Sequence, residues 1–83
     1  MPRSIIAAAM EIVLVTRRGC HLCNDALAAL RAIGVEPELR DVDADDDLYA
    51  LYDWRVPVVT VDGRVVAEGR IDLDAVRRAL PAV

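Results

Sequence analysis

Both cysteines of this 83-residue chain lie in one short stretch, RRGCHLC, which runs Arg17-Arg18-Gly19-Cys20-His21-Leu22-Cys23. The stretch follows residues 11–16 (EIVLVT), whose nearly all-apolar, β-branched composition predicts a strand buried on both faces. It leads into residues 21–33, where apolar side chains recur at helical spacing, and Gly34 predicts the end of that helix. The Cys-x-x-Cys pair is therefore expected where a buried strand passes into a helix.

Five further segments show regular patterns. Residues 36–42 (EPELRDV) alternate as a strand does, and residues 44–54 contain three early aspartates that suit the positive end of a helix dipole. Residues 57–61 (PVVTV) and 64–68 (RVVAE) have the composition of strands and are joined by Asp62-Gly63, a strong hairpin signal. Asp72 is expected to cap a last helix that ends before Pro81.

The predicted order of elements is therefore β-α-β-α-β-β-α. A strand–helix–strand unit implies a parallel pair of strands, and the hairpin adds an antiparallel edge. We expect an α/β domain with a four-stranded mixed sheet and three helices. The domain should span residues 11–83, with residues 1–10 (MPRSIIAAAM) as an N-terminal extension expected to be disordered and Met10 as an alternative start.

The composition argues against several classes of protein. A chain with 55% hydrophobic and 29% charged residues is expected to fold as one globular domain at this length. Its net charge of −4 argues against a general nucleic-acid binder. No apolar run reaches the roughly 18–20 residues that span a bilayer, and the apolar part of residues 1–10 is too short for a secretory signal. We expect a cytoplasmic monomer without nucleic-acid or membrane partners.

Two structural roles for Cys20 and Cys23 find little support. A disulfide between them would close almost the shortest possible loop, so it would stabilise the fold little, and the cytoplasm would keep it mostly reduced. A structural zinc ion needs four ligands, and the chain adds only His21, which lies between the two cysteines. A metal or iron–sulfur site would therefore need a second chain or an outside ligand.

A redox role fits the predicted placement better. Cys20 would lie at the start of the helix, where unpaired N–H groups and the positive end of the dipole stabilise a thiolate. Arg17 and Arg18 would add positive charge nearby. Because the thiolate is the attacking species, Cys20 is predicted to be the nucleophile. Cys23, one turn into the helix and more enclosed, would resolve the mixed disulfide.

The chain resembles the small bacterial glutaredoxin-like proteins of the thioredoxin superfamily. The resemblance covers residues 11–80 and rests on VTRRGCHLC, RVPVVTVDG and EGRIDLDAV. It implies a thioredoxin-like fold and a cis peptide bond between Val56 and Pro57 that faces the cysteines. The backbone of Val56 would then hydrogen-bond an extended peptide or glutathione by strand addition. Gly69 and Asp72 match the family segment that receives the γ-glutamyl group of glutathione.

The chain departs from the standard branches between its cysteines. His21 and Leu22 match neither the Pro-aromatic pair of glutaredoxins nor the Gly-Pro pair of thioredoxins. Residues 11–16 also lack a buried acid that could shuttle a proton. Both glutathione and a thioredoxin reductase therefore remain open as electron donors.

Several other residues have two interpretations. His21 either favours the Cys20 thiolate as an imidazolium or is simply an exposed residue of the first helical turn. Trp54 either flanks the cleft or belongs to the core. The run DVDADDD lacks the glycine and glutamate of a calcium loop and is better explained as a loop and helix cap. Four arginines either gather around one cleft, which would favour an anionic substrate such as glutathione, or are solvated surface charges: Arg17, Arg18, Arg55 and Arg70.

The sequence thus predicts a thiol–disulfide oxidoreductase with no bound cofactor or metal. Cys20 would attack a protein or glutathione mixed disulfide, Cys23 would resolve the intermediate, and glutathione or a reductase would restore the dithiol. The residues expected to bind the substrate or glutathione are Arg18, His21, Val56, Pro57, Gly69 and Asp72. The alternatives are a metal or iron–sulfur carrier that spans a dimer, and an interaction domain whose cysteines are incidental.

Overall fold

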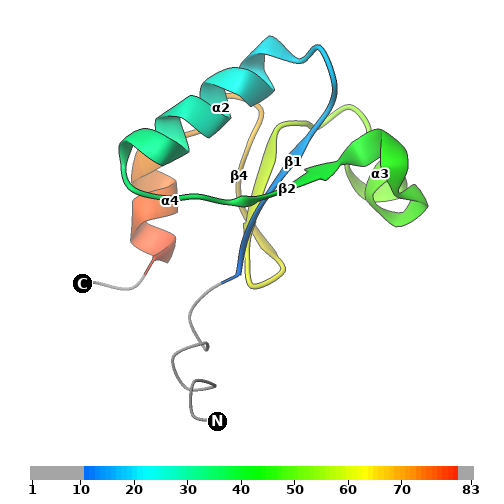
Figure 1. Ribbon diagram of the computed structural model, residues 1–83. Coiled ribbons are helices and arrows are strands. Elements are labelled where there is room, and N and C mark those ends of the chain that lie inside the picture. Colours follow the sequence, from blue (N-terminus) through cyan, green and yellow to red (C-terminus); the bar gives the residue numbers. More distant parts are fainter. Residues whose placement is uncertain (1–10, 81–83) are drawn as a thin grey trace, which may run out of the picture.

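The computed structural model of the chain describes residues 11–80, so the predicted extension at residues 1–10 lies outside the described residues, as do residues 81–83. The described part contains four strands, three α-helices and one short 3-10 helix (Figure 1). In chain order they are β1 (Ile12–Thr16), α2 (His21–Ala32), β2 (Glu38–Asp41), the 3-10 helix η1 (Val42–Ala44), α3 (Asp46–Tyr52), β3 (Val58–Val61), β4 (Arg64–Glu68) and α4 (Leu73–Ala79). The predicted order of strands and α-helices is confirmed.

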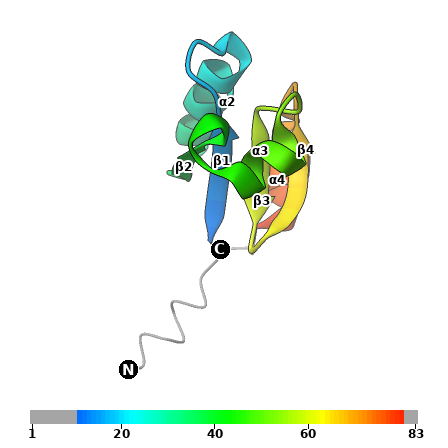
Figure 2. The same ribbon diagram turned by 90° about the vertical axis from the view of Figure 1, so that its right-hand side faces the viewer.

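The four strands form one mixed sheet in the order β2-β1-β3-β4, which Figure 2 shows from one edge to the other. β1 pairs with β2 in parallel through the α2 crossover, and with β3 in antiparallel fashion. β3 and β4 form the antiparallel hairpin. The predicted parallel pair and antiparallel edge are therefore both correct.

Helices cover both faces of the two central strands (Figure 1). On one face, Leu14 and Val59 pack with Leu30 of α2 and Val76 of α4. On the other face, the alternate side chains of β1 and β3 pack against the apolar side of α3. Because a central strand has helices above and below it, its side chains are buried in both directions, as the nearly all-apolar run at residues 11–16 predicted.

The hairpin turn has the geometry that its residues favour. Asp62 and Gly63 have positive φ angles of 52° and 86°, the pair of left-handed conformations that a two-residue turn between twisted strands requires. The Asp62 carboxylate also accepts a hydrogen bond from the backbone N–H of Glu11 at 2.9 Å. The turn therefore fixes the register of β3 and β4 and ties the hairpin to the start of β1.

The region between β2 and α3 differs from the prediction. The expected strand at residues 36–42 narrows to Glu38–Asp41, because the Asp41 carboxylate accepts a hydrogen bond from the Asp43 N–H at 2.8 Å and starts η1. Asp45 then caps α3. The helix was expected at residues 44–54, and it begins two residues later and ends two residues earlier. The acidic run is thus a loop and helix cap, as predicted.

No helix among residues 11–80 is both long and apolar enough to cross a membrane.

Candidate active site

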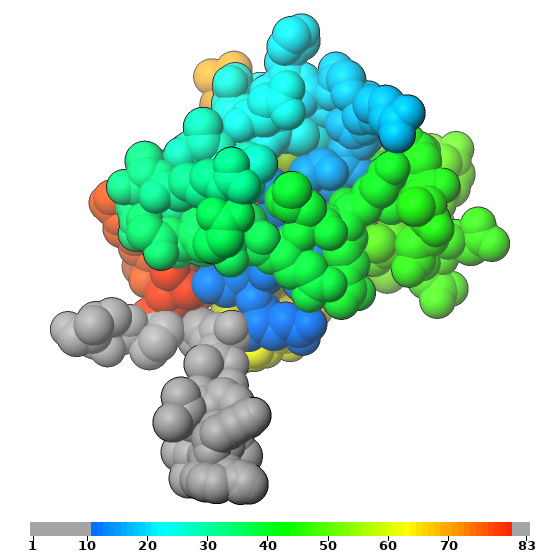
Figure 3. Space-filling model, in the orientation of Figure 1, coloured from blue at the N-terminus to red at the C-terminus, as the bar shows by residue number. Residues whose placement is uncertain are grey.

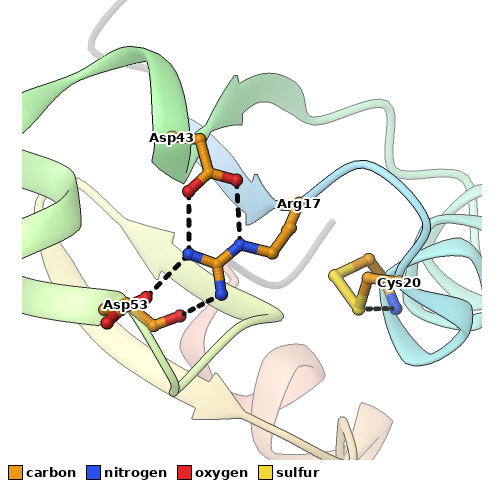
Figure 4. The surroundings of a disulfide bond; sticks show 5 residues. Arg17, Cys20, Asp43 and Asp53 are labelled. Carbon is orange, nitrogen blue, oxygen red and sulfur yellow. Dashed lines mark hydrogen bonds and ion pairs between the residues drawn. A yellow bond between two sulfur atoms is a disulfide. The ribbon is translucent and has the colours of Figure 1, made fainter.

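Cys20 and Cys23 lie where β1 passes into α2, joined by a disulfide bond (Figure 4). Cys20 is the N-cap of α2, and its Sγ accepts a hydrogen bond from the backbone N–H of Cys23 at 3.1 Å. A sulfur atom thus takes the place that an oxygen normally holds in a helix cap, at the positive end of the dipole. The predicted placement of the two cysteines is confirmed.

The two cysteines differ in their access to solvent. Cys23 is 2% exposed, whereas Cys20 is partly exposed. In the reduced protein, the Cys23 N–H and the helix dipole would both favour a negative charge on the Cys20 sulfur. Cys20 is therefore the cysteine that a disulfide in solution can reach, whereas the enclosed Cys23 can react with the Cys20 sulfur beside it.

The prediction that Arg17 lends positive charge to Cys20 is wrong. Its guanidinium group donates to both carboxylate oxygens of Asp43 at 2.9 and 2.8 Å and to the carboxylate of Asp53 at 2.7 Å. Figure 4 shows this group turned toward the two aspartates and away from the disulfide. The carboxylates, Asp43 first, raise the pKa of Arg17, and Arg17 in turn lowers the pKa of Asp43. The positive charge of Arg17 is thus compensated by Asp43 and Asp53.

Arg55 is engaged in the same way. Its guanidinium donates to both carboxylate oxygens of Glu68 at 2.7 and 3.1 Å and lies over the ring of Tyr52. The hydrogen bond to Glu68 raises the pKa of Arg55 and lowers that of Glu68. Of the two interpretations of the four arginines, a cluster of four available cations therefore does not form, because Arg17 and Arg55 are paired with acids. Within residues 11–80, Arg18 and Arg70 are the two of the four that make no ion pair.

The two available arginines line separate hollows beside α2. One hollow, of about 330 Å³, lies between α2 and the segment after β4, with Leu22, Gly69 and Arg70 among its walls. The other, of about 350 Å³, includes Arg18 and Cys23. Of the predicted substrate residues, Gly69 thus lines the first hollow and Arg18 the second, and Leu22 and Cys23 of α2 line different hollows.

The segment before β3 lies beside the first of these hollows. The Val56-Pro57 peptide bond is cis, as the resemblance implied, and Pro57 is buried. Its carbonyl oxygen accepts a hydrogen bond from the Gly69 N–H at 2.7 Å, which joins the two segments. In the described part of the chain, no backbone group pairs with the N–H or C=O of Val56. Three predicted residues, Val56, Pro57 and Gly69, therefore come together.

Two predicted residues stand apart from this group. His21 is exposed in the first turn of α2 and makes no hydrogen bond to another side chain in the part of the chain described here. Asp72 is the cap of α4, where one carboxylate oxygen accepts from the N–H groups of Asp74 at 2.9 Å and Ala75 at 3.4 Å. The predicted cap is confirmed, while binding roles for His21 and Asp72 stay predictions.

Sequence reasoning missed the partners of Arg17 and left the place of Trp54 open. Asp43 and Asp53 lie 26 and 36 residues from Arg17, and no local pattern connects positions so far apart. Trp54 was expected either in the core or at the cleft, and its 84% exposure excludes the core. A tryptophan at the end of the predicted helix at residues 44–54 gives no signal that separates these cases.

Within residues 11–80, no group of three or more histidine, cysteine, aspartate or glutamate side chains could hold a metal ion. The cysteine pair would therefore need ligands from outside this part of the chain to form a metal site.

The sheet order, the helices on both faces and the Cys-x-x-Cys pair at the start of α2 define a thioredoxin-like fold with a thiol redox site. More particularly, residues 11–81 match the glutaredoxin-like domain family (DUF836), and the chain belongs to this family. Family membership and the Cys20–Cys23 pair together support a thiol redox role.

Solved structures agree with this assignment. Protein Ne2328 from Nitrosomonas europaea is 29% identical, with a TM-score of 0.79, 88% of this chain covered and 93% of that chain. A structural genomics target from X. campestris is 33% identical, with a TM-score of 0.71 and coverage of 84% and 99%. The thioredoxin-like protein BC3987 is 30% identical, with a TM-score of 0.64 and coverage of 83% and 99%.

A more distant likeness concerns the fold alone. The holo form of glutaredoxin C1 from Populus tremula × tremuloides is 20% identical, with a TM-score of 0.55 and coverage of 92% of this chain and 78% of that chain. Among proteins with curated descriptions, no match was found.

Proposed function

We propose that this protein is a thiol–disulfide oxidoreductase that reduces disulfides in proteins or mixed disulfides with glutathione. The observation that carries the proposal is the asymmetry of the cysteine pair. The Cys20 sulfur caps α2 and accepts the Cys23 N–H, while the Cys23 side chain is enclosed. One cysteine is thus suited to attack an incoming disulfide and the other to complete the exchange.

The reaction has two exchange steps. The Cys20 thiolate attacks one sulfur of the substrate disulfide, so that a Cys20–substrate disulfide forms and the other substrate sulfur leaves as a thiolate, which takes a proton from solvent. Cys23 then loses its proton and attacks the Cys20 sulfur, which releases the second substrate thiolate. Two electrons have passed to the substrate, and Cys20 and Cys23 are left as a disulfide. An external thiol donor returns the pair to the dithiol.

The substrate would lie along the segment before β3. In the described part of the chain, the backbone N–H and C=O of Val56 have no backbone partner and can hydrogen-bond an extended chain, which would lie beside this segment as an added strand. The hollow at Leu22, Gly69 and Arg70, whose walls also include Asp25 and Ile71, can hold an adjoining part of the substrate, and Arg18 supplies a cation on the other side of α2. These contacts suit either a polypeptide or glutathione, and the reaction requires no bound cofactor.

The proposal places the protein in the cytoplasm, where glutathione and thioredoxin systems keep thiols reduced. It also treats the protein as a monomer, since one chain carries both the attacking and the resolving cysteine.

A peptide that carries a glutathione mixed disulfide provides the test. The reduced protein should release glutathione from the peptide, and Cys20→Ser should abolish this release. The oxidised protein should then be reduced either by glutathione or by thioredoxin reductase with its thioredoxin. If neither donor reduces the Cys20–Cys23 bond, the proposal fails. Metal analysis of the purified protein separates it from the carrier alternative.

A further inference from the structure

We propose that Arg17 is a positioning residue, which holds residues 53–57 against the Cys20 turn and so sets where a polypeptide disulfide meets the Cys20 sulfur. The inference rests on the proposed function for its catalytic consequence. The claim that Arg17 holds residues 53–57 in place rests only on the contacts of Arg17. Residues 53–57 are called the docking segment below.

Arg17 belongs to the same turn as the nucleophile. Its carbonyl oxygen accepts a hydrogen bond from the Cys20 N–H at 3.2 Å, which closes the turn between β1 and α2. From this fixed backbone the side chain reaches across to α3. Figure 3 shows the blue turn ahead of α2 meeting the green residues around η1 and α3 at the surface. Arg17 therefore connects the cysteine turn to a part of the chain that follows it by more than twenty residues.

The guanidinium group fixes the start of the docking segment twice. One N–H group donates to the backbone carbonyl oxygen of Asp53 at 2.9 Å, and another donates to the Asp53 carboxylate at 2.7 Å. The remaining donors form the paired contact with Asp43. A planar fork with several fixed donors can make these contacts at once, whereas an ammonium group is a single point charge.

The other hydrogen bonds of the docking segment in the described part of the chain tie it to α3 and to β4, and none of them reaches the cysteine turn; toward α3, the Asp53 N–H donates to the Tyr49 carbonyl and the Arg55 N–H to the Tyr52 carbonyl. The segment lies between the end of α3 and the start of β3, outside any helix or strand. In the middle of the segment Arg55 pairs with Glu68, and at its end the Pro57 carbonyl accepts the Gly69 N–H. Both of these contacts tie the segment to β4 and the residues after it. Among the hydrogen bonds and ion pairs within residues 11–80, those of Arg17 are the ones that join the segment to the cysteine turn.

The orientation of Arg17 argues for positioning over direct charge. The guanidinium group points away from the disulfide in Figure 4, and two carboxylates compensate it. It is also partly exposed, and ion pairs in such places add little to stability. What the contacts fix is the placement of the docking segment relative to Cys20.

The test compares Arg17→Gln and Arg17→Lys with the matched control Arg31→Gln. Arg31 makes a similar paired contact with Glu36, at 2.9 and 2.9 Å, at the far end of α2. Each reduced protein reacts with the glutathionylated peptide, which needs the docking segment, and with the small aromatic disulfide DTNB, which does not. Arg17→Gln should react about tenfold more slowly with the peptide, since a misplaced reactant is costly, and less than about twofold more slowly with DTNB. Arg17→Lys should recover part of the loss, and Arg31→Gln should match the native protein.

Trp54 gives a second readout that does not depend on activity. It is the only tryptophan of the chain and directly follows Asp53. Time-resolved anisotropy of its fluorescence should show a larger fast component in Arg17→Gln and no change in Arg31→Gln. The anisotropy of both variants is measured on samples that circular dichroism shows to be folded.

The possible outcomes are distinct. If the native protein does not react with the peptide, the proposed function fails, while the anisotropy still decides whether Arg17 holds the docking segment. An equal loss toward the peptide and DTNB would overturn the positioning role, because it would mean that Arg17 acts on the Cys20 sulfur itself. Unchanged anisotropy in Arg17→Gln would overturn it as well.

Discussion

The backbone N–H of Cys23 donates a hydrogen bond to the sulfur of Cys20 at 3.1 Å. The two cysteines of a Cys-x-x-Cys pair are alike in sequence, and this contact makes them chemically different. The Cys20 sulfur receives a donor and the helix dipole, while the Cys23 sulfur is enclosed beneath it. The order of attack that we propose rests on this difference.

The first prediction separates the two roles. Cys23→Ser should still attack the peptide mixed disulfide, but the Cys20–substrate disulfide should accumulate, because no second thiol can resolve it. Cys20→Ser should form almost no adduct, because the remaining thiol is 2% exposed. Mass spectrometry of the non-reduced proteins after a short reaction measures both adducts. Comparable adduct formation by the two variants would contradict the assignment.

The second prediction concerns acid stability. Hydrogen bonds from Arg17 lower the pKa of Asp43 in the folded protein relative to the unfolded chain. A carboxyl group with a lowered folded-state pKa stabilises the fold above its unfolded pKa, about 4 for aspartate, and this contribution is lost as the pH falls through the folded value. Asp43→Asn should therefore be slightly less stable than the native protein at pH 7, because an exposed ion pair adds little, and the difference should shrink below pH 4.

Urea unfolding at pH 7 and pH 3 measures this effect. Asp25→Asn is the control, because Asp25 makes no ion pair among residues 11–80. A stability difference for Asp43→Asn that stays constant between the two pH values would show that the Arg17 contact does not contribute.

The third prediction concerns the core between α2 and the sheet. Leu30 is fully buried on α2, so Leu30→Ala should lower the free energy of unfolding by about 2–5 kcal/mol, from lost burial and from the cavity left behind. Leu51→Ala makes the same change on α3 at a side chain that is 56% exposed, and it should change stability by at most about 0.5 kcal/mol. Urea unfolding of both variants gives the comparison. Similar losses for the two would mean that the burial is misassigned.

Most of the fold could be predicted because it depends on local patterns. The apolar run at residues 11–16, the turn at Asp62-Gly63 and the cap at Asp72 each act within a few residues, and each appears in the structure. The errors lie where short-range signals compete. Asp41, Asp43 and Asp45 all favour caps, and only the folded chain shows that Asp41 starts η1 while Asp45 starts α3.

The site could be predicted only in part, because its parts come from distant positions. The placement of Cys20 at the helix start, on which its proposed role as nucleophile rests, follows from a local pattern. The loss of Arg17 as an available cation depends on Asp53, 36 residues away, and no local pattern reports that contact. Leu51 shows the same limit within a helix, since it lies on the apolar side by spacing and is nevertheless exposed. The orientation of α3 on the sheet decides which of its apolar side chains are buried.

The fourth prediction concerns Trp54, which is 84% exposed in the docking segment. Removing a side chain with so little buried surface should change the free energy of unfolding by at most about 0.5 kcal/mol. Large exposed aromatic side chains are common anchors for protein partners. Trp54→Ala should therefore slow the reaction with a folded protein disulfide and leave the reaction with DTNB unchanged, whereas Trp54→Phe should keep most of the rate.

Stopped-flow kinetics with both substrates measures the effect of Trp54→Ala, and Leu51→Ala provides an exposed apolar control outside the docking segment. Equal rates for Trp54→Ala and the native protein with the protein substrate would exclude Trp54 as an anchor. An equal loss toward both substrates would instead place the effect at Cys20.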